Sequence, residues 1–184
     1  MVDIFRTSDA AMEIVKEAID INPDFADSWF KLGNVQKQYA DYFREIRADL
    51  NHAQSFYFHA IESYQQRNKL EYSLFTTIEI ANVKYNLAKI NLLKGKPQEA
   101  MALISDSIKT KLDVVPFRHS YFSDLIAILE TQVELLQLQE KYNQSTSETS
   151  AAVKQMLESI CVIEGITETQ KLRLNDFSEF YQCQ

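Results

Sequence analysis

The stretch AIDINPDFADSWFKLGN, residues 18–34, decides the fold. Its Pro23 separates the end of one amphipathic segment from the start of the next, because Pro interrupts a helix but is tolerated where a new helix begins. Trp29 and Leu32 then open an apolar stripe whose spacing of three, seven, four and three residues is helical. The stripe continues through Tyr39, Phe43 and Ile46. An apolar stripe at this period must face another helix, so the stretch predicts two consecutive packed helices.

The scarcity of chain breakers extends this prediction to the whole chain. The 184 residues contain only Gly 3 and Pro 3. A Rossmann fold, a P-loop or a β-sandwich needs such residues at many tight turns, so these classes are excluded and an all-α fold is predicted. With 46% hydrophobic residues, a chain of this length can bury a core without metal ions or disulfides.

Charge and hydropathy restrict the partners. The net charge of −7 argues against DNA or RNA, because nucleic-acid binders carry clustered positive charge. No segment approaches the roughly 20 apolar residues that cross a bilayer, and the charged first residues do not resemble a signal peptide, so no membrane partner and a cytoplasmic location are expected. Cys161 and Cys183 lack CxxC spacing and are expected to be reduced thiols, with a disulfide as the alternative.

Helical periodicity and breakers predict about eight helices that form antiparallel pairs. The expected helices lie near 9–21, 26–47, 51–67, 70–94, 97–111, 118–142, 147–163 and 167–182. We interpret residues 1–184 as a single helical-repeat domain. It would comprise a half repeat at 1–24, pairs at about 25–68, 69–115 and 116–164, and a terminal helix at 165–184.

A repeated pattern of small residues supports this division. Each copy of the pattern has a small residue, a larger apolar residue four positions later and a second small residue three positions after that. The copies start at positions 11, 53, 100 and 152. The second copy consists of Ala53, Tyr57 and Ala60. Small side chains on one helix face allow a neighbouring helix to approach closely.

The junction in residues 18–34 resembles that between two tetratricopeptide repeats. The matching residues are Ala18, Pro23, Trp29, Leu32 and Gly33, followed in the second helix by Ala53, Tyr57 and Ala60. A second junction matches at Leu87, Ala88 and Ala100. Gln36 stands where the family has Tyr, and the repeats are longer than the family's 34 residues, which predicts lengthened helices in a short tetratricopeptide-like superhelix, an α-solenoid. Gly33 lies inside a helix at a cost of about 1 kcal/mol, so we expect the paired helix to come closest there.

The resemblance implies a peptide-binding face formed by the first helix of each pair. The residues expected to bind are Lys31, Asn34, Lys37, Asn82, Tyr85, Asn86 and Lys89. Lys31, Asn34, Asn86 and Lys89 are similar in type to the Lys/Asn clamp by which some family members hold a terminal carboxylate, since these groups donate hydrogen bonds to an anion. The alternative is an ordinary solvated helix face, where Lys and Asn are common.

Catalytic and metal-binding patterns are missing from the sequence. The three histidines, His52, His59 and His119, form no HExxH or ExxH arrangement, and no nucleophile motif or phosphate-binding loop occurs. We therefore expect no enzyme, no cofactor and no metal, but a noncatalytic interaction or scaffold module that binds a peptide or protein.

Two alternatives stay open. One is a repeat region accessory to a larger enzyme such as a glycosyltransferase. The other is a structural domain that forms homodimers through exposed aromatic rings, because Phe56, Tyr57 and Phe58 are consecutive and cannot all face inward.

Overall fold

The computed structural model describes residues 3–117, 121–161, 174 and 177, and this part of the chain is all-α. The helices are α1 (Asp3–Ile21), α2 (Ala26–Glu45), α3 (Leu50–Leu70), α4 (Leu74–Leu93), α5 (Pro97–Val114), the 3-10 helix η1 (Val115–Phe117), α6 (Tyr121–Lys141) and α7 (Ser147–Cys161). The all-α prediction is confirmed. Seven α-helices stand where about eight are predicted, because the expected helix at 167–182 lies outside the described residues except for Leu174 and Phe177.

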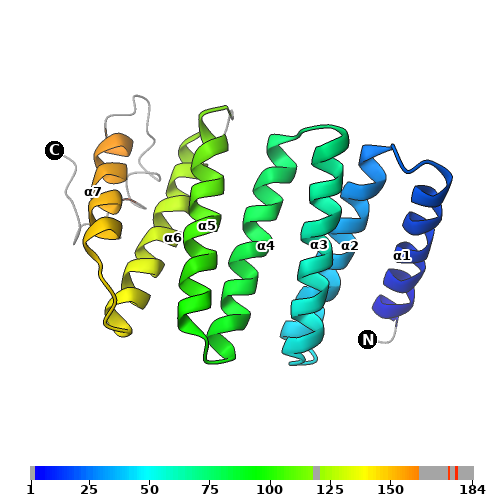
Figure 1. Cartoon of the computed structure of the whole chain (residues 1–184), viewed down its shortest axis with the longest axis horizontal. Coiled ribbons are helices and arrows are strands. Elements are labelled where there is room, and N and C mark those ends of the chain that lie inside the picture. The colour runs from blue at the N-terminus through cyan, green and yellow to red at the C-terminus, as the bar shows by residue number, and fades with distance from the viewer. Residues whose placement is uncertain (1–2, 118–120, 162–173, 175–176, 178–184) are drawn as a thin grey trace. The chain divides into compact units, whose positions relative to one another are not determined.

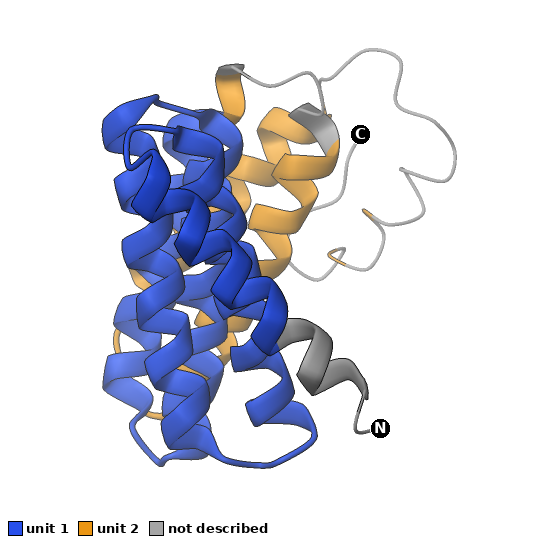
Figure 2. Ribbon diagram, turned by 90° about the vertical axis from the view of Figure 1, so that its right-hand side faces the viewer, with its two compact units in different colours: residues 1–114 blue, residues 115–184 orange. Residues whose placement is uncertain are grey.

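The chain divides into two compact units, residues 1–114 and 115–184 (Figure 2). In the first unit, helices α1 to α5 run alternately up and down, each joined to the next by a short turn (Figure 1). Helix α2 packs mainly against α3, and α4 mainly against α5, so antiparallel pairs are the building element. Helix α3 also packs on α4, which joins the two pairs, and α1 packs on α2. The interpretation of the whole chain as one repeat domain stays a prediction.

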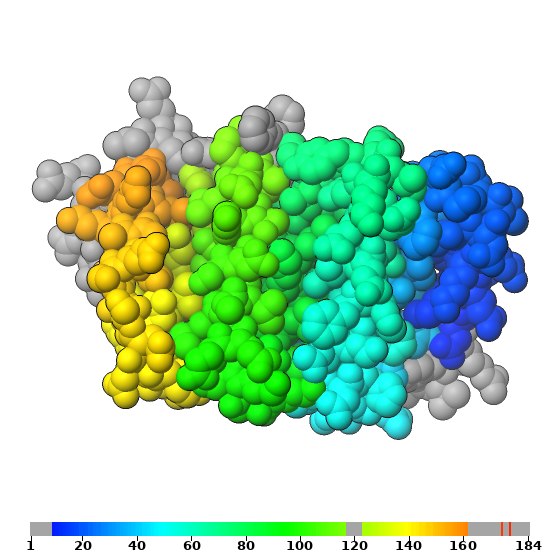
Figure 3. Space-filling model, in the orientation of Figure 1, coloured from blue at the N-terminus to red at the C-terminus, as the bar shows by residue number. Residues whose placement is uncertain are grey.

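Alanine side chains allow the helices of the first unit to pack closely. Ala53, Ala60, Ala88 and Ala100 are completely buried, and Leu87 is 1% exposed beside them. A methyl side chain adds little width to a helix, so neighbouring axes can approach until larger side chains interdigitate. The space-filling view shows the side chains of α3, α4 and α5 in continuous contact on the face drawn (Figure 3).

The three consecutive aromatic residues of α3 divide between core and surface. The Tyr57 side chain is completely buried, Phe56 is half-buried, and Phe58 is 49% exposed. The expectation that the three rings cannot all face inward is confirmed, because successive residues of a helix point about 100° apart.

The junction at residues 18–34 is held by packing and by hydrogen bonds, among them one from the Trp29 side chain. The indole nitrogen of the half-buried Trp29 donates to the carbonyl oxygen of Pro23 at 2.8 Å, which ties the first turn of α2 to the end of the α1–α2 connection. Leu32 is buried, Ala18 is half-buried and Pro23 is exposed.

Gly33 of α2 lies directly against the Tyr64 ring of α3. A Cβ atom at this position would be 2.5 Å from Cε1 and 2.6 Å from Cδ1 of Tyr64, a completely buried residue of α3. Such distances are far inside van der Waals contact, so only glycine fits beside this ring. Gln36, one turn later, is also buried, and its amide oxygen accepts a hydrogen bond from the Ser63 hydroxyl at 2.7 Å. A polar pair therefore occupies the place where the family pattern has an aromatic residue.

Local chemistry sets the turns between the helices. Gly95 adopts a left-handed φ of 70° after α4, and Pro97 begins α5, as its preference for the first helical turn predicts. The Asp49 carboxylate caps α3 by accepting from the backbone N–H groups of Asn51 and His52 at 3.2 and 3.1 Å. These hydrogen bonds lower the pKa of Asp49, with those from His52 contributing most.

The second unit contains a packed pair formed by α6 and α7. Its core includes Ile126, Leu129 and Leu136 of α6 together with Val153 and Ile160 of α7. Cys161 at the end of α7 is disulfide-bonded, so the expectation of two reduced thiols is wrong. The other cysteine, Cys183, lies outside the described residues. The absence of CxxC spacing does not by itself report that a cysteine is reduced.

Candidate functional site

The residues expected to bind a partner lie on α2 and α4, which run in the same direction because two reversals of the chain separate them (Figure 1). Two contacts join these helices directly. The ring centroids of Phe30 and Phe75 are 5.7 Å apart, and the Lys37 ammonium group lies 2.5 Å from a carboxylate oxygen of Glu79. The α2/α4 face, as we name the surface around these contacts, thus has an aromatic end, a polar centre and a far end near Tyr85 and Lys89.

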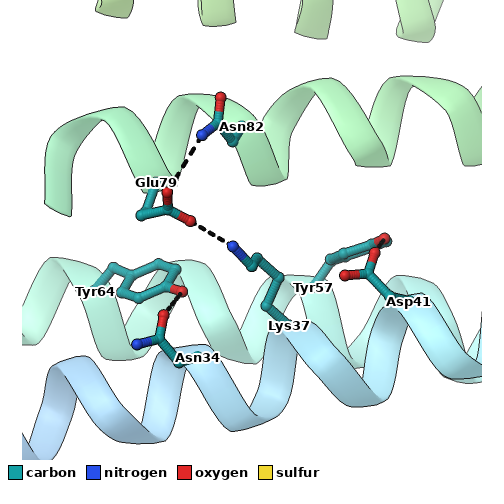
Figure 4. Close-up of polar contacts among 7 residues, drawn as sticks. All are labelled: Asn34, Lys37, Asp41, Tyr57, Tyr64, Glu79 and Asn82. Carbon is teal, nitrogen blue, oxygen red and sulfur yellow. Dashed lines mark hydrogen bonds and ion pairs between the residues drawn. The ribbon is translucent and has the colours of Figure 1, made fainter. Parts of the chain in front are cut away.

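The polar centre is a network of compensated charges (Figure 4). Glu79 accepts from the Lys37 ammonium group through one oxygen and from the Asn82 amide through the other, at 2.5 and 3.4 Å. The Lys37 and Glu79 side chains are only 27% and 13% exposed. Since Lys37 is neutralised inside the protein, its charge is not available to hold an anionic ligand.

Buried tyrosines extend the network toward α3. The Tyr64 hydroxyl donates to the Asn34 side-chain oxygen at 2.7 Å, and the Tyr57 hydroxyl donates to Asp41 (Figure 4). Burial is the main cause that raises the pKa of both hydroxyls. The negative charges of Glu79 and Asp41 raise the pKa of Tyr64 further, and Asp41 does the same for Tyr57. Both tyrosines therefore remain neutral hydrogen-bond donors at physiological pH, a structural role rather than that of a general base.

The far end of the face is positively charged. The Lys89 ammonium group lies 4.3 Å from the centroid of the Tyr85 ring, and that of Lys111 from α5 lies 6.0 Å from it. These are cation–π distances. Lys89 is exposed, and none of the described carboxylates is within ion-pair distance of it. An acidic group approaching this end would find a cation without a competing internal partner.

The aromatic end of the face is formed by the rings of Phe30 and Phe75. Phe75, at the first turn of α4, is 53% exposed, whereas Phe30 is half-buried between Phe75 and Tyr64. Lys31 follows Phe30 and is exposed, and no described carboxylate forms an ion pair with it. The nearest acidic residue along the helix is Asp27, one turn earlier and also exposed.

The structure brings only some of the expected binding residues together. Asn34, Lys37 and Asn82 meet in the polar centre through Tyr64 and Glu79. Lys31 follows Phe30 and lies at the level of Phe75. Phe75 is fourteen residues before Lys89 on α4, which at 1.5 Å per residue is about 21 Å along the helix. The two exposed lysines therefore do not form one compact clamp. Asn86 is half-buried on α4, between these two levels.

Sequence reasoning missed two residues that define the face, Phe75 and Glu79. Both lie on the helical stripe that contains Asn82 and Asn86, at steps of four, three and four residues, so the period itself was the available signal. The Lys/Asn clamp pattern does not indicate them, because it contains neither an aromatic ring nor a carboxylate.

Other site chemistries find no support in the described ranges. No group of three or more His, Cys, Asp or Glu side chains is placed there to hold a metal ion. None of the helices with described coordinates has both the length and the apolar composition of a membrane-crossing segment.

Comparisons with known proteins give no family. No protein-family model and no curated protein matches the sequence. Among solved structures, the chain is similar to the "DHF79 filament" at 13% identity, covering 97% of this chain and 100% of that chain with a TM-score of 0.43. The chain is also similar to the "DHF58 filament" at 15% identity, covering 97% of this chain and 90% of that chain with a TM-score of 0.43. With the de novo designed helical repeat protein DHR64 the identity is 12%, the match covers 95% of this chain and 89% of that chain, and the TM-score is 0.38. TM-scores below 0.5 assign neither a family nor a function.

Proposed function

We propose that this chain is a noncatalytic interaction module, related to tetratricopeptide repeats and working in the cytoplasm, that binds a peptide or protein segment along the α2/α4 face. The observation that carries the proposal is the Phe75 ring, 53% exposed and in contact with Phe30 of the preceding helix pair. A partner that covers this ring would remove its exposed apolar area from water, which favours binding.

Binding on this face would be noncovalent. Phe30 and Phe75 offer apolar area, while Lys31 and Lys89 offer charge that no described carboxylate neutralises. The polar centre between them contributes hydrogen-bonding groups that the fold already holds in place, so little side-chain entropy would be lost there on binding.

The test compares two charge-reversal variants in a selection of displayed random dodecapeptides on the full chain. Lys31→Glu/Lys89→Glu is expected to lose the acidic peptides that the parent protein enriches, with unchanged helicity because both side chains are exposed. The matched control Lys16→Glu/Lys109→Glu makes the same change of charge at exposed positions of α1 and α5 and is expected to retain these peptides. A parent protein that enriches no peptide would refute the proposal, as would equal losses in both variants.

Self-association is a second candidate function. Apolar side chains are also exposed elsewhere in the first unit, with Ile21 at 85% and Phe58 at 49%. A homodimer would bury such groups, and sedimentation at several concentrations detects it. Phe58→Ser would then shift the chain toward monomer, whereas a monomeric peptide binder would sediment the same with and without this substitution.

A further inference from the structure

We infer that the segment bound on the α2/α4 face is an extended peptide with an aromatic side chain about five residues away from an acidic one, held by Phe30 and Phe75 at one end and by Lys89 at the other. This inference rests on the proposed function and specifies its ligand.

The aromatic end suits a ring because its own rings leave an edge uncovered. Phe30 and Phe75 are inclined at 58°, and Phe30 and Tyr64 at 40°, with centroids 5.7 Å apart in both pairs. Aromatic rings prefer such tilted arrangements, and a further ring at the exposed side of Phe75 would continue the series. The exposed carboxylate of Asp27, one turn before Lys31 on the same helix, lowers the positive potential at this end relative to that at Lys89, although the Asp27 and Lys31 side chains form no ion pair.

The polar centre rejects charge in the middle of the ligand. Lys37 is paired with Glu79, and Asn34 and Asn82 are engaged by Tyr64 and Glu79. An acidic ligand group opposite Glu79 would meet a carboxylate of the same sign, and a basic one would compete with an ion pair that is already formed. Neutral residues are therefore expected in the ligand between the aromatic and the acidic side chain.

The far end selects an acid by charge complementarity. The exposed Lys89 has no described ion-pair partner, and its ammonium group is held over the Tyr85 ring at 4.3 Å. Lys84, one residue before Tyr85, is in contrast paired with Asp106 of α5 at 2.8 Å. Lys89 is thus the cation of α4 that a ligand carboxylate can reach without displacing an internal one.

The spacing follows from the geometry of the helix. Because Lys89 leans back over Tyr85, its charge lies near the level of that residue, ten residues after Phe75. Ten residues of helix correspond to about 15 Å, and an extended peptide advances about 3.3 Å per residue. The aromatic and acidic side chains of the ligand should therefore be four to six residues apart. A helical ligand would instead need about ten residues between them.

The experiment sequences the random dodecapeptides that the full chain enriches and counts aromatic–acidic pairs at each separation. We expect a maximum at four to six residues. Phe75→Ala should remove the aromatic preference but keep the acidic one, and Lys89→Gln should do the reverse. The controls Phe58→Ala and Lys109→Gln, which alter exposed residues of α3 and α5, should leave both preferences unchanged.

Binding of one enriched synthetic peptide is then measured by fluorescence anisotropy. Replacing its acid by the amide should weaken binding about two- to fivefold, the effect of an exposed ion pair, and replacing its aromatic residue by Ala about tenfold. Enriched peptides with no preferred separation, with one near ten, or with preferences that both variants retain would overturn the inference while the proposed function stands. If no peptide is enriched, the proposed function fails first.

Discussion

Replacing Gly33 by Ala tests the packing of the first helix pair, because two physical effects of opposite sign meet at this position. In an isolated helix, Ala is favoured over Gly by about 1 kcal/mol. Here the added Cβ would lie 2.5 Å from Cε1 of Tyr64, so the ring must move by about 1 Å to restore normal carbon–carbon contact. The ring is completely buried, packs on Phe30 and is hydrogen-bonded to Asn34, so it has little room to move.

The magnitude follows from these terms. Overpacking a buried site costs about 1–3 kcal/mol, and loss of the Tyr64–Asn34 hydrogen bond about 1 kcal/mol more. Subtracting the propensity gain of about 1 kcal/mol leaves a net loss of about 1–3 kcal/mol in the free energy of unfolding. For a chain of this size, the thermal midpoint should fall by about 2–12 °C.

Urea unfolding followed by circular dichroism measures this loss, and a double-mutant cycle identifies its cause. Tyr64→Val removes both ring atoms that collide with the new methyl group as well as the hydrogen bond to Asn34, so the cost of Gly33→Ala should fall by about 2–4 kcal/mol in that background. Gly95→Ala is the control. It strains a left-handed residue with no atom within 4 Å of the added Cβ, and its cost should add to that of Tyr64→Val. Stabilisation by Gly33→Ala, or additivity with Tyr64→Val, would show that the two helices are not in close contact here.

Two further predictions concern buried hydroxyl groups. Ser107→Ala removes a buried hydrogen bond of 2.7 Å from α5 to the carbonyl oxygen of Ala81 in α4, so it should lower the free energy of unfolding by about 1 kcal/mol. The exposed control Ser159→Ala should lower it by less than half as much in the same urea titration. Alkaline pH should destabilise the fold, because the pKa of Tyr57 is raised in the native state. The stabilisation of the native state by protonated Tyr57 is complete at pH values below the unfolded pKa of about 10. This stabilisation is lost as pH rises above that value, where the unfolded chain has released the proton but the native protein has not. Thermal midpoints from pH 8 to 11 should therefore fall less steeply in Tyr57→Phe than in the parent chain or in the exposed control Tyr72→Phe, and parallel curves for all three would contradict this reasoning.

The helices could be predicted from the sequence because their ends depend on neighbouring residues. Pro97 and Ser147 begin α5 and α7 where breakers and capping residues predict. Periodicity predicts that the fourth helix starts at 70, but α4 starts four residues later at Leu74, and no Gly or Pro marks the turn before it. The structure uses a side-chain cap there instead: the Ser73 hydroxyl accepts from the Thr76 N–H at 3.3 Å.

The site was harder to predict because its residues interact across the sequence. Lys37 and Glu79 are 42 positions apart, and each alone resembles a charged residue on a solvated helix face. Whether such a residue remains available to a ligand depends on which turn of the next helix pair lies opposite, which helical periodicity does not specify. The chemical type of the face could thus be predicted, but not which of its lysines is already neutralised.

The same contact that neutralises Lys37 also restricts the register of α2 and α4 on the α2/α4 face. A partly buried ion pair adds little net stability, because desolvation of both charges offsets their attraction, but it disfavours arrangements that leave either charge unpaired. Sliding α4 by one turn relative to α2 would separate Lys37 from Glu79 and move Phe75 about 5.4 Å along Phe30. The ion pair therefore disfavours other registers. It thereby favours the register in which Phe30 and Phe75 are in contact. Lys89 keeps its distance from Phe75 because both residues lie on one helix, so their separation is a fixed property of α4.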